Sequence, residues 1–279
     1  AAETGSPRGI TSDKFEDRVE WMADEHEVEI PMDVEQADVL AVMSSIEIQK
    51  YPQSIAATAK ILNAAGESWT FRTDGFEATN FGMLSGNPGW QKEATMKLIN
   101  AAIKIGAKLI VLPECGHAYM ALRWMGANMY GKPLPFKVMH ISEYMADALN
   151  KGKIKVKKVD SSVTYHDPCQ VSRRGGATQA ARDVIRHLGV DFREMEYGGD
   201  YNWCCGGGGG VVTIKRAGPL RHRVFKLKMD QVEKTEADEL LSSCANCRQS
   251  FDDSQEHFNW DYKMGSLMEM VAENLEDEA

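Results

Sequence analysis

Five of the six cysteines lie between positions 169 and 247, in three segments that are far apart in the sequence. The segments read Asp167-Pro168-Cys169, then Trp203-Cys204-Cys205-Gly206 at the start of a run of five glycines, then Cys244-Ala245-Asn246-Cys247. Only a folded chain can bring these sulfurs together. Thiolates are soft ligands that select zinc, Cu(I) or iron–sulfur clusters. The spacing therefore predicts a metal or cluster site.

An iron–sulfur cluster fits the five cysteines better than zinc does. Tetrahedral zinc takes four ligands, and no histidine stands at finger-like spacing from a cysteine pair. The side chains of adjacent Cys204 and Cys205 diverge and would reach different irons, which indicates a larger or asymmetric cluster rather than an ordinary cubane. The glycines from Gly206 onward let the backbone approach such a core and aim amide N–H groups at its sulfides. Structural zinc, or spare buried thiols, is the alternative.

The motif of Cys169, Cys204-Cys205-Gly206 and Cys244-x-x-Cys247 resembles the CCG, or cysteine-rich, domain of heterodisulfide reductase B and D subunits. The five cysteines match that family in order and spacing, and the resemblance covers about residues 37–260. It implies that the five thiolates and Gly206 form the site of a noncubane [4Fe-4S] cluster, at which disulfides are reduced.

The segment Glu-Cys-Gly-His-Ala at 114–118 resembles, within that family, the K subunit of the sulfite-reductase-associated DsrMKJOP complex. This resemblance implies an oxidoreductase that reduces, or in reverse oxidises, a disulfide, trisulfide or thiol pair. Its implied partners are a small cysteine-tailed sulfur-carrier protein and the haem or iron–sulfur subunits of a membrane complex. The implied location is cytoplasmic, peripheral to the inner membrane through those subunits.

Composition and net charge restrict the classes of function that this chain could have. The 279 residues are 43% apolar, which is enough for a substantial core. A net charge of −9, with acidic residues crowding both ends, argues against a nucleic-acid partner. We find neither an apolar run of bilayer-spanning length nor a signal peptide, and the clustered cysteines are typical of a reducing cytoplasm. The start at Ala1 without Met is compatible with a clipped or processed chain that lacks an upstream domain.

The elements that must position the cysteines repeat once along the chain. The first copy predicts strands at 39–46, 69–72 and 108–112 with helices at 52–65 and 91–105. The second copy predicts strands at 162–165, 191–196 and 239–242 with helices at 178–188 and 221–233. Glycines end the helices at matching places. The pattern predicts an α/β protein of two Rossmann-like βαβ halves with parallel sheets, related by a pseudo-twofold, and the cluster near their junction.

Four regions follow from this repeat. We expect an N-terminal connector at 1–36 with an amphipathic helix at about 12–25, and a first half at 37–132. A crossover at 133–160 would carry a helix at 141–149. The second half, at 161–279, would hold the cluster and end in an acidic helical tail with packed and solvated faces. Because ligands of parallel sheets gather beyond the carboxyl ends of the strands, the cysteines of the second half should converge.

The first half keeps one cysteine at its strand ends and should hold no cluster of its own. We expect Ser44, Ser45, Asn80, Cys115 and His117 to line its share of a crevice, where small or polar groups leave room for a sulfur-bearing tail. We predict that His117 is catalytic as a proton donor and that Cys115 is catalytic as a redox-partner thiol. Cys115 could equally lie beside the cluster without reacting, or serve as a buried hydrophobe.

Other polar residues near the cysteines have both functional and purely structural interpretations. His166 could hydrogen-bond a cluster sulfur or relay a proton, or be a satisfied core histidine. The basic residues Arg173, Arg174, Lys215 and Arg216 could neutralise cluster charge, dock an acidic tail, or be a solvated surface. The glycine run lacks the Gly-Lys-Ser/Thr ending of a nucleotide loop.

A second function class remains open, namely a non-catalytic electron-relay subunit of a flavin-linked dehydrogenase. A site open at the cluster edge would favour catalysis, and a sealed site would favour relay.

Overall fold

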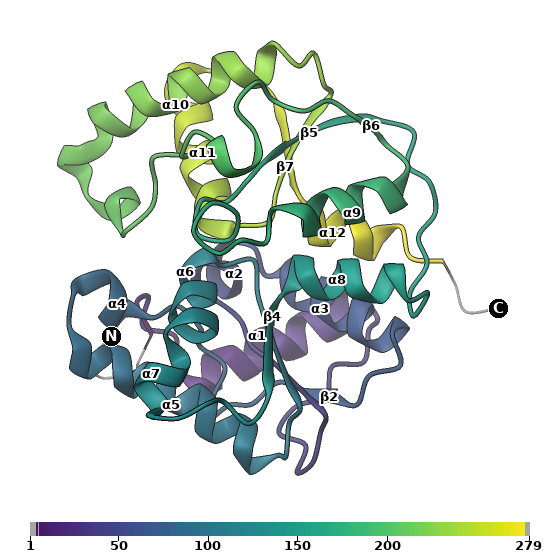
Figure 1. The fold of residues 1–279 in the computed structure, drawn as a ribbon, viewed down its shortest axis with the longest axis vertical. Helices are drawn as coiled ribbons and strands as arrows, with labels where there is room; N and C mark the ends of the chain where they lie inside the picture. The colour runs from purple at the N-terminus through teal and green to yellow at the C-terminus, as the bar shows by residue number, and fades with distance from the viewer. Residues whose placement is uncertain (1–3, 5, 277–279) are drawn as a thin grey trace.

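The computed structural model describes residues 4 and 6–276, and in it the chain folds into two α/β halves (Figure 1). Each half contains a four-stranded parallel sheet. The first sheet has the order β2-β1-β3-β4, with β1 Val39–Ala41, β2 Trp69–Thr70, β3 Leu109–Leu112 and β4 Lys137–His140. The second has the order β6-β5-β7-β8, with β5 Ser162–His166, β6 Asp191–Phe192, β7 Glu239–Ser242 and β8 Lys263–Ser266. The predicted pair of Rossmann-like halves is confirmed.

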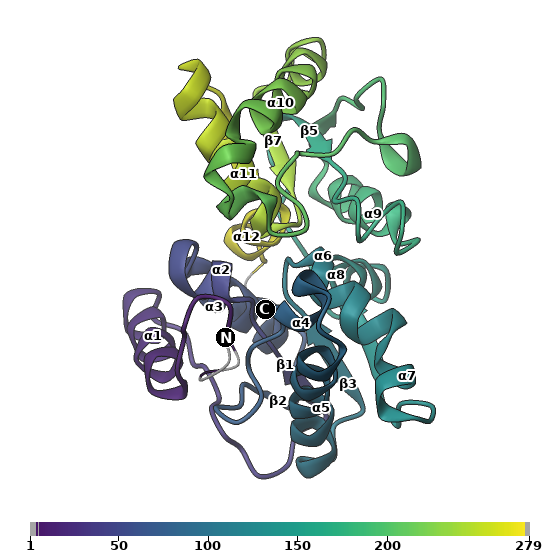
Figure 2. The same cartoon turned by 90° about the vertical axis from the view of Figure 1, so that its left-hand side faces the viewer.

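Helices cover both faces of each sheet (Figure 2). Those of the first half are α1 Ser12–Glu25, α2 Ser45–Lys50, α3 Gln53–Ala64, α4 Phe81–Ser85, α5 Pro88–Lys104, α6 Gly116–Ala118, α7 Gly126–Tyr130 and α8 Ile141–Asn150, with a π-helical turn at Tyr119–Trp124. Those of the second half are α9 Thr178–Leu188, α10 Gly218–Glu233, α11 Ala245–Phe258 and α12 Leu267–Glu273. The strands alternate their side chains between the two faces, so that Val39 and Ala41 join one core while Leu40 and Val42 join another.

The two halves share one hydrophobic core. It combines α1, α3 and α8 of the first half with α9 and α12 of the second, through buried residues such as Ile55, Met145, Val184 and Met268. Helix α12 packs on α3, and α8 packs on α9. A common apolar core of this kind fixes the halves relative to each other, because separating them would expose it to water.

Several sequence expectations need correction. Each sheet has a fourth strand that the pattern did not reveal, since β4 and β8 are short and carry few apolar residues. The region expected as a crossover therefore supplies β4 to the first sheet. The strand expected at 39–46 ends at Ala41, because the capping box of Ser44 and Glu47 starts α2. The tail helix α12 is buried against the first half along most of its length.

The amphipathic helix near residues 12–25 is confirmed as α1, which begins at the N-cap Thr11. Its buried face consists of Phe15, Val19 and Met22, whereas Trp21 is exposed. Helix α9 spans the predicted residues, and its Gly189 adopts the left-handed conformation that ends helices. None of the described helices combines the length and the apolar character required to cross a membrane.

Candidate metal centre

The five cysteines meet at the carboxyl edge of the second sheet. Cys169 follows β5, Cys204 and Cys205 lie in the loop between β6 and α10, and Cys244 and Cys247 lie at the start of α11. Thiol hydrogen bonds connect them in the order 169, 204, 205, 247 and 244. Cys169 and Cys204 are partly exposed and the other three are buried. The structure thus brings together every cysteine that the sequence singled out as a ligand.

The thiols cannot all ionise by themselves. Hydrogen bonds from its two neighbours hold the pKa of Cys204 well below its usual range. The pKa values of Cys169, Cys205 and Cys247 are raised, first by hydrogen bonds to neighbouring thiols and then by burial. Like charges at such short separation oppose one another. A cationic group is therefore required if all five sulfurs are to be thiolates at once.

A buried ion pair holds the Cys169 segment against the segment that precedes Cys204. Arg182 on α9 donates two hydrogen bonds of 2.9 Å to the Asp167 carboxylate, which also accepts from the Gly199 amide at 2.7 Å. The side chain of Asn202 donates to the Asp167 carbonyl. These bonds join the ends of β5 and β6, so Cys169 and Cys204 become neighbours although 34 residues separate them in the chain.

The glycine run allows the backbone to come close to the sulfurs. The Gly206 amide donates to Cys204 Sγ at 3.4 Å, and the Gly207 amide donates to Cys205 Sγ at 3.5 Å. Gly206 has φ +81°, a conformation that side chains other than glycine rarely adopt. A Cβ on Gly207 would lie 2.8 Å from Ser250 Cβ. The amides thus point at two cysteine sulfurs, whereas the sequence had predicted that they would point at the sulfides of a cluster.

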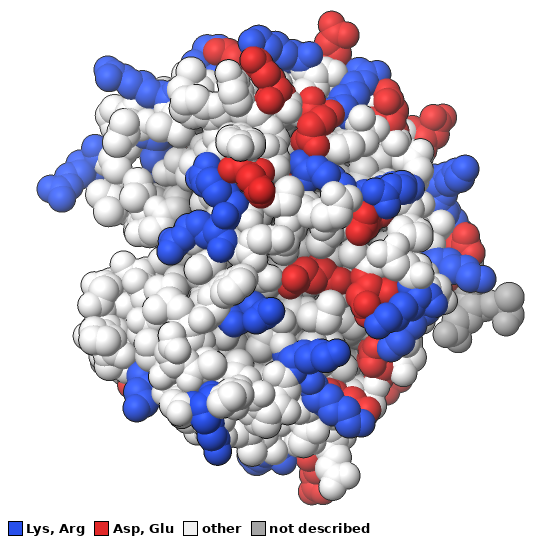
Figure 3. Space-filling view, in the orientation of Figure 1, with Lys and Arg blue, Asp and Glu red and all other residues white. Residues whose placement is uncertain are grey.

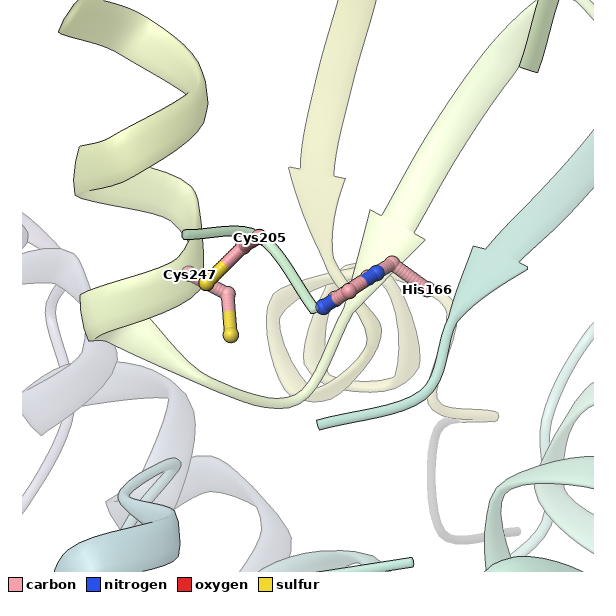
Figure 4. A group of neighbouring side chains, drawn as sticks. All are labelled: His166, Cys205 and Cys247. Atoms are coloured by element: carbon pink, nitrogen blue, oxygen red, sulfur yellow. The ribbon is translucent and has the colours of Figure 1, made fainter. Parts of the chain in front are cut away.

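Two buried basic residues flank the thiols. His166, the last residue of β5, is 1% exposed, and one of its ring nitrogens lies within 4.8 Å of Cys205 Sγ and Cys247 Sγ (Figure 4). Burial first, and then Lys228, lower the pKa of His166 to about 3. Lys228 on α10 is 1% exposed and donates to Gln231 Oε1 at 2.9 Å. Across the described chain, no carboxylate lies within ion-pair distance of its ammonium group.

The first half contributes Cys115 and His117 to the same region. Cys115 is buried and lies near Cys244, and burial raises its thiol pKa far above the usual value. His117 Nε2 accepts a hydrogen bond from the Gly209 amide at 3.3 Å, and burial followed by Arg174 lowers its pKa. The α6 segment also presses on the Cys169 loop, since a Cβ on Gly116 would lie 2.7 Å from Gln170 Cβ. Cys115 and His117 therefore lie beside the group of five thiols.

The prediction that Ser44, Ser45 and Asn80 line an open crevice is wrong. Ser44 and Asn80 are buried N-caps of α2 and α4, and Ser45 is fully buried. Three carboxyl groups at this edge were not predicted from the sequence, namely those of the buried Glu47 and Glu114 and of the partly buried Glu77. Their only sequence signal was the helix-capping spacing of Ser44 and Glu47. The first half thus fills its strand ends with its own hydrogen-bonding groups.

These carboxyl groups hold the backbone around them. Glu47 accepts from the amides of Ser44 and Glu114, at 3.1 Å each. Glu114 lies 3.6 Å from Arg248 of α11, which in turn pairs with Glu269 of α12 at 2.8 Å. Burial raises the pKa of Glu47 to about 7 and that of Glu114 to about 8. This network joins the first half to the start of the cysteine-bearing helix.

Basic residues gather on the visible face beside the hollow between the halves (Figure 3). Arg173 and Arg174 are exposed in the loop after Cys169, and Arg173 donates to the Asn202 carbonyl at 2.8 Å. Lys215 and Arg216 are exposed just after the glycine run. The exposed aromatic rings of Tyr197 and Trp203 lie on the segment that leads to Cys204.

The donor set fits an iron–sulfur cluster. Five sulfurs from three segments exceed the requirement of tetrahedral zinc, and iron–sulfur clusters are held by thiolates. Backbone amides point at two of the sulfurs, and a buried ammonium with no carboxylate partner among the described residues offsets negative charge.

Comparison with known proteins shows what these features are similar to. Residues 163–252 match the model of the cysteine-rich domain CCG. The chain is 34% identical to the D subunit of the dihydromethanophenazine:CoB–CoM heterodisulfide reductase of Methanosarcina barkeri, over 66% of this chain and 45% of the relative. It is 30% identical to the D subunit of the same enzyme from Methanosarcina mazei, over 93% of this chain and 63% of the relative. It is 25% identical to the "EtfAB:quinone oxidoreductase" of Syntrophomonas wolfei, over 71% of this chain and 28% of the relative.

The chain thus spans less than two thirds of the length of each of the two relatives from Methanosarcina. The CCG match and the similarity to heterodisulfide reductase subunits imply an iron–sulfur cluster, with which the group of cysteines is consistent. Both of these relatives are named as subunits, which is compatible with an assembly of several chains.

Proposed function

The chain contains a CCG cysteine-rich domain and is a homologue of the D subunit of heterodisulfide reductase, and we therefore propose that it reduces a disulfide or trisulfide of a small sulfur-carrier protein, or catalyses the reverse oxidation. The observation that carries the proposal is the convergence of five thiols, of which Cys169 and Cys204 remain partly exposed. Partial exposure at one edge is what a site that meets an external sulfur requires.

Cys169, Cys204, Cys205, Cys244 and Cys247 would hold the cluster, with Gly206 supplying an amide to it. When bound, an iron–sulfur cluster of the noncubane [4Fe-4S] type supplies electrons one at a time. Arg182, through Asp167, would keep Cys169 beside Cys204. Lys228 would offset the negative charge of the thiolates.

Reduction of a disulfide breaks one S–S bond and consumes two electrons and two protons, giving two thiols. The electrons would come from haem or iron–sulfur partner subunits. His117 would relay a proton to the departing thiolate. Burial and Arg174 lower its pKa and favour the neutral imidazole, so a proton taken up for each turnover would be passed on readily. Because its pKa is raised, Cys115 would stay a protonated thiol beside Cys244 and would be a poor nucleophile. The proposed catalytic role therefore depends mainly on His117.

The hollow between the halves and the basic residues near it suit an acidic, cysteine-tailed carrier. Exposed Arg173 and Arg174 would steer such a tail toward Cys169 and Cys204. We further propose that the protein works within a membrane-associated complex of sulfur metabolism, attached from the cytoplasmic side through its partner subunits.

A relay function is the second candidate, and similarity to the "EtfAB:quinone oxidoreductase" favours it. In that case the cluster would pass electrons between subunits of a flavin-linked dehydrogenase, and no substrate would reach the cysteines. Three buried thiols are compatible with this alternative, whereas the exposed edge at Cys169 and Cys204 favours catalysis.

One experiment separates these functions. Anaerobically purified protein is analysed for iron and acid-labile sulfide and by electron paramagnetic resonance, and is then assayed for reduction of a small disulfide with a chemical electron donor. Catalysis predicts turnover that falls roughly 100-fold in His117→Ala, with iron content unchanged. His187→Ala, an exposed histidine on α9, is the matched control and should retain turnover. Iron and sulfide without any disulfide turnover would support relay, and their absence would refute both functions.

A further inference from the structure

His166 is a buried histidine whose ring has no protein partner. Among the described residues, neither Nδ1 nor Nε2 takes part in a hydrogen bond, although the side chain is 1% exposed. Burying a polar group without a hydrogen-bond partner is unfavourable, and such groups in native proteins call for an explanation. The ring therefore indicates a binding partner that belongs to the site and is not part of the polypeptide.

The other two buried histidines differ from His166. His140 Nδ1 lies 2.8 Å from Ser142 Oγ, where the residue caps α8. His117 Nε2 accepts from the Gly209 amide. Each of them thus uses one ring nitrogen in the protein.

The ring of His166 is held in place and directed at the sulfurs. It packs edge-to-face on Phe251, with centroids 4.9 Å apart and an interplanar angle of 82°. Figure 4 shows one ring nitrogen on the side that faces Cys205 and Cys247. The nitrogen and the two sulfurs lie within 4.8 Å of one another, close enough for one metal ion to contact all three.

We propose that His166 is a ligand to an iron of the cluster, on the side of the site where Cys205 and Cys247 lie. This inference rests on the iron–sulfur cluster of the proposed function and adds one imidazole to the five thiolates. Iron accepts imidazole and thiolate ligands alike, and neutral imidazole is the form that binds metals.

A histidine ligand has a measurable consequence for the cluster. It adds a neutral donor at one iron while all five thiolates remain, and the ligands of a cluster are among the features that set its reduction potential. Loss of the His166 ligand should therefore shift the reduction potential of the cluster, provided that the iron stays bound.

The test is nitrogen hyperfine spectroscopy of the reduced holoprotein. Protein labelled with ¹⁵N only in histidine should show the strong coupling of a nitrogen bound directly to iron, with the ¹⁵N pattern in place of the ¹⁴N pattern. His166→Phe keeps a ring against Phe251 and should abolish that coupling. His117→Ala is the matched control, as the other histidine beside the thiols, and should retain the coupling.

The outcomes are separable. If wild-type protein contains no iron and sulfide, the proposed cluster itself is refuted. If it contains both but shows only the weak coupling of a hydrogen-bonded nitrogen, or loses strong coupling in His117→Ala instead, the ligand assignment is overturned and the cluster stands. The labelled wild-type protein decides this even if His166→Phe fails to fold.

Discussion

The two halves share one strand order and differ at the carboxyl edge of their sheets. In the first half that edge contains Glu47, Glu77 and Glu114, which bind backbone amides and hydroxyl groups of their own surroundings. In the second half it contains five thiols whose main partners are one another. One framework can therefore close its strand ends with carboxyl groups or leave them for a cofactor.

Cys115 and Cys244 are the most direct point of difference between the halves. Each follows the third strand in its sheet, β3 or β7, and each is the N-cap of the next helix with extended backbone angles. The helices differ in what comes next, because α11 places Cys247 in its first turn whereas α6 places Ala118 at the same spacing. A lone thiol is therefore present in the first half, and a pair is present in the second.

The largest expected effect comes from exchanging these two thiols in turn. Cys244→Ser should remove most of the iron, because it deletes one proposed ligand at the centre of the site. Cys115→Ser should leave the iron content unchanged, since this residue has no place in the proposed ligand set. Iron and sulfide analysis of both variants measures the difference. Equal losses would erase the distinction between the halves.

Removal of iron should destabilise the second half before the first. The segment 206–210 is all glycine, which loses more conformational entropy on folding than other residues, and few contacts besides those to the thiols order it. Limited proteolysis after anaerobic chelation should cut near this segment, while strands β1 and β3 stay protected. The comparison would fail if apoprotein and holoprotein gave the same fragments.

The carboxyl groups of the first half predict a pH dependence. The pKa of Glu47 is raised from 4.5 to about 7, so the folded protein binds more protons than the unfolded chain between these values. The free energy of unfolding should therefore fall as pH rises through this window, by up to a few kcal/mol. Urea unfolding of the holoprotein at pH 5 and pH 8 measures it by tryptophan fluorescence.

Glu47→Gln provides the comparison for that measurement, because its side chain stays neutral. The variant should show a shallower fall in unfolding free energy between pH 5 and pH 8 and should keep its iron. A slope as steep as that of the wild type would assign the pH dependence to other groups.

The smallest expected effect concerns Lys228. Glu114 of the first half lies beside Arg248 of the second, whereas the ammonium group of Lys228 is buried beside the thiols without a carboxylate partner among the described residues. Lys228→Met should lower the reduction potential of the cluster, because a positive charge favours the reduced form. We expect a change within about tenfold in the reduction equilibrium, or about 59 mV for one electron. Lys226→Met, exposed on the same helix, is the control. Equal reduction potentials in Lys228→Met and Lys226→Met would show that Lys228 has no special electrostatic effect on the cluster.

The fold class and the group of five cysteines could be predicted from the amino-acid sequence. Helix-ending glycines such as Gly189 and buried runs such as β7 are local signals, and two repeats of the same order identify parallel βαβ halves. The cysteine spacing was specific enough to indicate a cofactor, because few other roles require thiols in three segments. The short strands β4 and β8 were not predicted, because they are recognisable only by their hydrogen bonds to a neighbouring strand.

The surroundings of the thiols became visible only in the folded protein. Nothing near His166 in the sequence reveals that both its ring nitrogens lack partners among the described residues, since that depends on β5, the Cys205 loop and α11 together. The burial of Lys228 and Glu114 was equally hidden, because a charged residue in a sequence is usually exposed. Local patterns report backbone preference and the burial of one face, whereas the polar contacts of a site arise between segments that the chain brings together only on folding.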